Sequence, residues 1–203
     1  EESISYYKQS LEISRQIGNK IGEGNNLGNL GTVYSVLGQY KESISYYKQS
    51  LEINRQIGDK RSEGIFLGNL GDVFIKLESW EEAEQTLSEA IEICTITFPP
   101  AAGAFYGSLS LVYSQQGKID GALSVLAEGE PLVEVYPSEH GKFLCTKAKV
   151  LHIANQSDKA TQSLSKAKSI AEELKTEEDS DLGKAITETT QFLSSPSTPS
   201  SEE

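Results

Sequence analysis

Two histidines and two cysteines are the side chains of this chain best suited to nucleophilic or metal chemistry. Cys145 and His152 are seven residues apart, which places them on one face of a helix, two turns from each other. Two ligands are too few for a closed metal site, and simple packing of both side chains is the alternative. His140 and Cys94 add no further ligand pattern. We therefore expect no metal site and no cofactor.

Sequence motifs for catalysis are missing as well. The chain has no GxxxxGK[ST] phosphate loop, no HExxH pair and no GxSxG nucleophile turn. The acidic cluster of Glu81, Glu82 and Glu84 lies where a helix is expected to begin, and carboxylates there complement the helix dipole. We expect no catalytic residue, and the sequence indicates a protein that is not an enzyme.

The sequence is dominated by an internal repeat of 40 residues. Residues 1–20 return at 41–60 with three differences, and LGNLGTVYSVLGQY at 27–40 returns as LGNLGDVFIKLESW at 67–80. Repeats of this length are typical of solenoids, propellers and helical arrays. Stacked repeats expose an extended surface, which suits the binding of another chain better than chemistry in a closed pocket.

Each repeat is predicted to be a hairpin of two amphipathic helices, because apolar residues recur at spacings of three and four. Gly18, Gly38 and Gly58 stand where these helices should end in a left-handed residue. Glu78 replaces the glycine of one turn. There, Ser79 and a glutamate three residues later are expected to form a capping box for the next helix.

The predicted fold is an all-α solenoid of antiparallel helical hairpins, and the later units follow at spacings of 39 and 38 residues. A terminal helix should cover the last unit, and the Ser- and Pro-rich end should be disordered. The predicted divisions are the second helix of a truncated unit at 1–20, units at 21–60, 61–98 and 99–137, a degenerate unit at 138–175, a capping helix at 176–193 and a disordered tail at 194–203.

Composition narrows the range of partners. A net charge of −12 disfavours nucleic acid, which requires a dense Lys and Arg surface. No run of 18 apolar residues is present, so no membrane span is expected. Reduced cysteines and the lack of a secretory signal indicate a cytoplasmic protein. The chain begins within a repeat, so we expect a fragment whose open N-terminal end is available for self-association.

The repeat resembles the tetratricopeptide repeat (TPR) over roughly residues 1–175. The resemblance rests on Leu27, Leu30-Gly31 and Tyr34, followed by a small residue and an aromatic residue four positions later. The LGNLG core looks like the longer 40-residue TPR variant of polarity adaptors and multidomain bacterial signalling proteins. This resemblance implies a right-handed superhelix whose first helices line a concave groove, occupied by a peptide or helix of a partner.

Residues off the apolar stripe of the first helices are the candidates for that groove. Asn29 and Asn69 are the central pair, because a carboxamide both donates and accepts and can bind the backbone of an extended peptide. The alternative is that these amides only satisfy neighbouring helices. Gly28 and Gly68 flank them and are interpreted as room for the partner's backbone. The predicted groove residues are Asn25, Asn29, Thr32, Ile65, Asn69, Asp72, Lys142 and Lys149.

Lys142 and Lys149 are the basic candidates of this set, in the degenerate unit, where they would meet an acidic segment or form a solvated surface. Some TPR grooves clamp a C-terminal carboxylate with Lys and Asn, as in adaptors for heat-shock chaperones. Here Gly28 and Gly68 precede the asparagines where lysine would be needed, so we do not expect that mode of binding.

The sequence thus favours a protein-interaction module that binds a peptide or helix of another protein in a TPR groove. The alternative is a regulatory TPR segment of a larger bacterial signalling enzyme, such as a kinase, cyclase or ATPase. These two hypotheses differ in what precedes Glu1 in the full-length protein.

Overall fold

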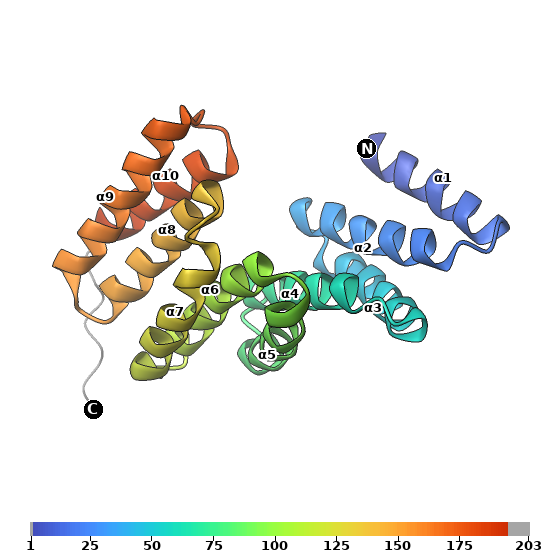
Figure 1. The fold of residues 1–203 in the computed structure, drawn as a ribbon, viewed down its shortest axis with the longest axis horizontal. Coiled ribbons are helices and arrows are strands. Elements are labelled where there is room, and N and C mark those ends of the chain that lie inside the picture. The colour runs from blue at the N-terminus through green and yellow to red at the C-terminus, as the bar shows by residue number, and fades with distance from the viewer. Residues whose placement is uncertain (1, 195–203) are drawn as a thin grey trace. The chain divides into compact units, whose positions relative to one another are not determined.

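A computed structural model describes residues 2–194 of the chain, and this part is built from α-helices without strands (Figure 1). The all-α repeat architecture expected from the sequence is confirmed. The handedness of the superhelix stays a prediction. In chain order the helices are α1 (Glu2–Gln16), α2 (Lys20–Val36), α3 (Tyr40–Ile57), α4 (Lys60–Lys76), α5 (Trp80–Thr97), α6 (Pro99–Gln115), α7 (Ile119–Val133), α8 (Pro137–Ile153), α9 (Ser157–Leu174) and α10 (Asp181–Ser194).

The helices form two compact units, which we call unit 1 (residues 1–105) and unit 2 (residues 106–203). In unit 1, α2 pairs with α3 and α4 pairs with α5, while α1 packs on α2 and α3 packs on α4. In unit 2, α8 pairs with α9, α7 packs on α8, and α10 lies against both α8 and α9. Ser194, predicted as the first residue of the disordered tail, is instead the last residue of α10, and the other tail residues, 195–203, lie outside the described part of the chain.

The turns between helices follow the glycine pattern. Gly18, Gly38 and Gly58 have φ of 70°, 71° and 74°, so their predicted role as left-handed helix-ending residues is confirmed. Glu78 adopts the same conformation with φ of 55°. A side chain in this region is strained, because its Cβ approaches the following carbonyl oxygen. The hairpin geometry therefore imposes the left-handed turn even where glycine is absent.

The predicted capping box at the start of α5 is wrong. The Ser79 side chain makes no capping hydrogen bond. The Ser79 backbone N–H already donates to the carbonyl oxygen of Phe74 at 2.9 Å, as part of the left-handed turn. A capping box needs that N–H for the glutamate three residues later. The turn that ends α4 thus removes the donor that the box would use.

The paired helices of unit 1 approach each other closely at glycines inside the first helix. A Cβ added to Gly31 would lie 2.7 Å from the ring of Tyr47, and the Ser43 hydroxyl donates to the Gly31 carbonyl oxygen at 2.8 Å. Gly71 is similarly covered by Leu87, again at 2.7 Å. The second helix fills the volume that each glycine leaves, which offsets the roughly 1 kcal/mol that glycine costs inside a helix.

Gly28 and Gly68 do not leave room for a partner, and that interpretation is corrected. A Cβ on Gly28 would lie 2.2 Å from the ring of Phe66, and one on Gly68 would lie 2.0 Å from the ring of Phe105. Each of these rings comes from the next first helix along the chain. The two glycines are thus seats for the chain's own aromatic rings.

Candidate functional site

The candidate groove residues of unit 1 lie on two first helices that contact each other, α2 and α4. We call this set the first-helix face. Thr32 is exposed, and the other five members are half-buried. The members are Asn25, Asn29 and Thr32 on α2, and Ile65, Asn69 and Asp72 on α4.

Three of these residues gather around the hydroxyl group of Tyr47, a buried residue of α3. The Thr32 and Tyr47 hydroxyls share a hydrogen bond of 3.0 Å. Burial raises the pKa of Tyr47, and the negative charge of Asp72 raises it further, whereas hydrogen bonds with Thr32 and Asn69 act in the opposite direction. Tyr47 therefore reaches from the second helix of its hairpin to the polar residues of the first-helix face.

In the sequence, Tyr47 stands out only as the aromatic residue of the TPR pattern. Its ring does pack, since it covers Gly31 and lies 6.1 Å from the ring of Phe66. A signal for its second role was present, because Phe or Leu would fill the same volume without the hydroxyl group. Leu87 does so at the equivalent place in the next hairpin.

The remaining members of the first-helix face differ in how firmly they are held. Asn25 accepts a hydrogen bond from the Ser62 hydroxyl at 3.2 Å, which ties α2 to α4. Asn29 and Ile65 are half-buried on the same helices. Asn25 thus joins α2 to α4 and Thr32 joins α2 to α3, while all six members keep part of their surface toward solvent.

The two candidate lysines lie on α8 in unit 2, and both approach carboxylates. The Lys142 ammonium lies 2.8 Å from Glu139, one turn earlier on the same helix. The Lys149 ammonium lies 3.6 Å from Glu188 on α10. Their side chains are 33% and 25% exposed, respectively. The charge that they would offer to an acidic segment is already shared with the chain's own acids.

Two ion clusters that sequence reasoning missed hold the connections between hairpins of unit 1. The Glu63 carboxylate, 2% exposed, accepts from Arg55 at 2.8 Å and from Lys60 at 2.6 Å. Glu23 accepts from Arg15 at 2.9 Å and from Lys20 at 2.7 Å in the same way. The repeated RQIGxK segment followed by glutamate three residues later was the available signal.

The pKa of both carboxyl groups lies below the ordinary value. Hydrogen bonds from Lys20 and Arg15 lower the pKa of Glu23. Burial pushes the pKa of Glu63 upward, but the hydrogen bonds and positive charges of Lys60 and Arg55 outweigh that effect. Both glutamates are therefore ionised at neutral pH, and they stabilise the loops rather than offering a proton.

Both cysteines and His152 are placed for packing. Burial raises the pKa of Cys94 to about 11 and also raises the pKa of Cys145, so neither thiol is activated. The His152 ring contacts the Phe192 ring edge-on at 5.7 Å. Within residues 2–194 no group of three His, Cys, Asp or Glu side chains could hold a metal ion. None of the helices in this part combines the length and apolar character that a bilayer crossing requires.

Comparison with known proteins agrees with this architecture. Residues 1–56 match the sequence model of the family described as tetratricopeptide repeat. No curated protein matches the sequence.

Solved structures share the fold at low identity. BtubC (BKLC) from P. vanneervenii is 18% identical with a TM-score of 0.70, covering 85% of this chain and 73% of that one. The apo form of RapI is 15% identical with a TM-score of 0.69, covering 94% and 82%. A putative kinesin light chain from Podosopora anserina, with nearly identical TPR-like repeats, is 14% identical with a TM-score of 0.62, covering 86% and 88%.

Proposed function

We propose that this chain is a tetratricopeptide-repeat protein that acts as a non-catalytic interaction module and binds a peptide or helix of a partner protein on its first-helix face. The observation that carries the proposal is the recurrence of asparagine at one position on two contacting helices. Asn29 and Asn69 are 40 residues apart in sequence, and both remain partly accessible on α2 and α4.

The surroundings of these asparagines suit an extended or helical peptide. Ile65 offers an apolar contact, and Asp72 adds a negative charge beside the buried Tyr47 hydroxyl. A carboxamide can donate to a carbonyl oxygen of the bound peptide and accept from its N–H. Together with the net charge of −12, Asp72 favours a peptide that carries basic residues.

Peptide selection on the purified chain tests this function. Peptides from a random display library would be selected on the immobilised chain, synthesised, and titrated against the wild type and the Asn29→Ala/Asn69→Ala variant. We expect affinity to fall about tenfold or more, since several hydrogen bonds of about 0.5–1.5 kcal/mol each are lost. Hydrogen exchange should show protection of α2 and α4 when the peptide is bound.

The control is Lys48→Ala, a change at an exposed position of α3 away from the first-helix face. It should bind the selected peptides as the wild type does. Circular dichroism would show that each variant keeps its helices. Unchanged binding by the double asparagine variant, or protection confined to other helices, would contradict the proposal.

A further inference from the structure

A second surface of different chemistry lies in unit 2, on a groove bounded by α7, α8 and α9. The groove encloses about 420 Å³. Its apolar part is formed by Leu123, Leu144 and Leu151, of which the last two are buried. Its charged part is formed by Lys147, Lys159 and Lys166, and no carboxylate lines it. We call it the lysine groove.

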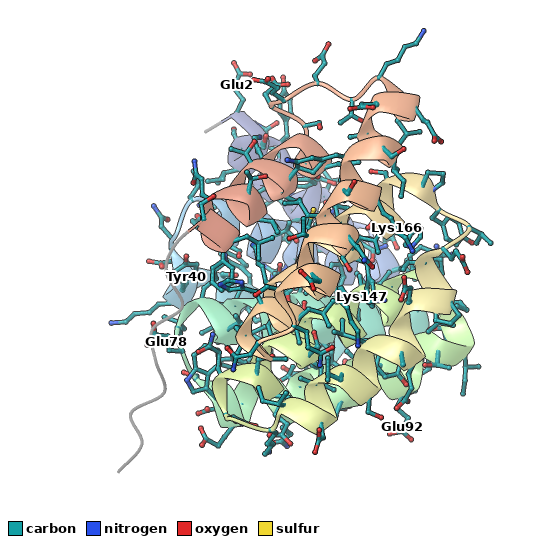
Figure 2. All side chains as sticks on the ribbon, turned by 90° about the vertical axis from the view of Figure 1, so that its left-hand side faces the viewer. Glu2, Tyr40, Glu78, Glu92, Lys147 and Lys166 are labelled. Atoms are coloured by element: carbon teal, nitrogen blue, oxygen red, sulfur yellow. The ribbon has the colours of Figure 1, made fainter. Side chains whose placement is uncertain are left out.

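Two of these lysines keep their charge available. The Lys147 ammonium is neutralised by Glu130 at 2.5 Å. Lys159 donates to the neutral Gln156 side chain at 2.8 Å, and both Lys159 and Lys166 are exposed. Neither of the two pairs with a carboxylate within residues 2–194. Figure 2 shows Lys147 and Lys166 on the side of unit 2 that faces the viewer.

The spacing of the two available charges is defined by one helix. Lys159 and Lys166 are seven residues apart on α9, which is two turns, or about 10 Å at about 1.5 Å per residue. Two turns of a partner helix span the same length. Carboxylates seven residues apart on such a helix would therefore stand opposite the two lysines while its apolar side faces the leucines.

The repeat does not account for this charge. In unit 1 the corresponding groove is formed by α1, α2 and α3 and carries mixed charges, with Lys8 and Arg15 balanced by Glu12 and Glu42. The repeat spacing brings Lys159 to the place of Glu42 and Lys166 to that of Gln49. A groove of the same architecture is thus basic in one unit and balanced in the other.

We propose that the lysine groove docks an acidic amphipathic helix of a partner protein. Charge complementarity selects the acidic helix, and Leu123, the half-buried leucine of the groove, offers an apolar contact to its other side. Nucleic acid does not fit, because two available lysines on a chain of net charge −12 cannot hold a polyanion. This surface is separate from the first-helix face, so its failure would leave the proposed function standing.

A designed peptide pair tests the proposal on the full chain. The probe is a fluorescein-labelled amphipathic helix with leucines on one side and glutamates seven residues apart beside them. Its counterpart carries lysine in place of each glutamate. Fluorescence anisotropy should show binding of the acidic peptide, weakening as salt is added, and binding of the basic peptide at least tenfold weaker.

Charge reversal locates the binding. Lys159→Glu/Lys166→Glu should weaken binding of the acidic peptide tenfold or more, while Lys41→Glu/Lys48→Glu should leave it unchanged. The control pair has the same seven-residue spacing on exposed positions of α3, so it alters the net charge equally. All four lysines are exposed, so both variants should keep the wild-type circular dichroism spectrum.

Four results would overturn the proposal. The acidic peptide shows no saturable binding, the basic peptide binds equally well, the two charge-reversal variants lose equal affinity for the acidic peptide, or a second copy of the chain occupies the groove. Sedimentation equilibrium would reveal the last as dimers that Lys159→Glu/Lys166→Glu abolishes.

Discussion

Two repeat positions are occupied by leucines in unit 1 and by charged residues in unit 2. In unit 1, Leu11 and Leu30 are buried in one apolar cluster of α1, α2 and α3. Repeat spacings of 40, 39 and 38 residues bring Glu130 and Lys147 to these places in unit 2, where they form an ion pair. The side chains of this pair are 25% and 29% exposed, so water still reaches them.

The repeat position of Glu23 and Glu63, the glutamates of the ion clusters, also differs between the two units. Glu23 and Glu63 are held there by two cations each in unit 1. The same repeat position in unit 2 is His140, whose Nε2 lies 3.6 Å from Glu130. Different residue types therefore occupy the same repeat positions in the two units, and their packed neighbours differ with them.

Substitutions at Gly68 and Gly107, the glycines that face aromatic rings, should give the largest difference in stability between the two units. In unit 1 a Cβ on Gly68 would lie 2.0 Å from the Phe105 ring, but in unit 2 a Cβ on Gly107 would lie 3.3 Å from Phe143. Gly68→Ala should lower the free energy of unfolding by about 2 kcal/mol, since overpacking costs up to about 3 and alanine returns about 1 in helix propensity. Urea denaturation would measure the loss.

Gly107→Ala is the matched variant in the other unit. We expect it to be neutral or slightly stabilising, because its neighbours need to move only slightly. Equal effects of the two substitutions would show that the aromatic seats do not distinguish the units.

The buried Glu63 gives the next largest effect. Glu63→Gln should lower the free energy of unfolding at pH 7 by about 1–2 kcal/mol, because two charge-assisted hydrogen bonds are weakened while the partly exposed cations stay hydrated. A carboxyl group with a lowered pKa stabilises the fold above its unfolded pKa, and that stabilisation is lost as pH falls through the folded value. The difference between wild type and variant should therefore shrink well below pH 4.5.

Urea denaturation at pH 7 and at about pH 3 would measure this. Glu52→Gln, at an exposed position of α3, is the control and should have little effect at either pH. A wild-type advantage over Glu63→Gln that is unchanged in acid would contradict the role of the ionised carboxylate.

Placing leucine, the residue found in unit 1, at both positions of the unit 2 ion pair tests the comparison directly. Glu130→Leu/Lys147→Leu should stabilise the chain by about 1 kcal/mol, because a partly buried ion pair is often less favourable than apolar residues of similar volume. Lys147→Leu alone should destabilise it, since Glu130 then loses its closest cation. Thermal unfolding of both variants would decide, and a destabilised double variant would mean that unit 2 has adapted to its ion pair.

The smallest effect is expected at the left-handed turns. Glu78→Gly should raise the free energy of unfolding by about 0.5–1 kcal/mol by removing strain at φ of 55°. Gly38→Glu, at the same turn of the preceding hairpin, should cost a similar amount. Chemical denaturation of the two variants would test this symmetry, and a destabilised Glu78→Gly would show that the glutamate side chain has a favourable contact.

Local patterns were enough to predict the helices and most of their ends. Apolar spacing of three and four residues depends on the helical period alone, and Gly18, Gly38 and Gly58 end helices through their own φ. The pairing of helices also followed, since Gly31 inside a helix requires a close neighbour. These inferences involve residues a few positions apart, so the chain order contains the information.

Contacts between helices were decided by the tertiary structure. Whether Gly28 faces a partner or the Phe66 ring depends on how successive hairpins pack, as does the approach of Thr32, Asn69 and Asp72 to the Tyr47 hydroxyl. The capping box failed for the same reason, because the preceding turn had already used the Ser79 N–H. Repetition at 40 residues marks a position as important, but only the packed neighbour determines whether it serves the core or a surface.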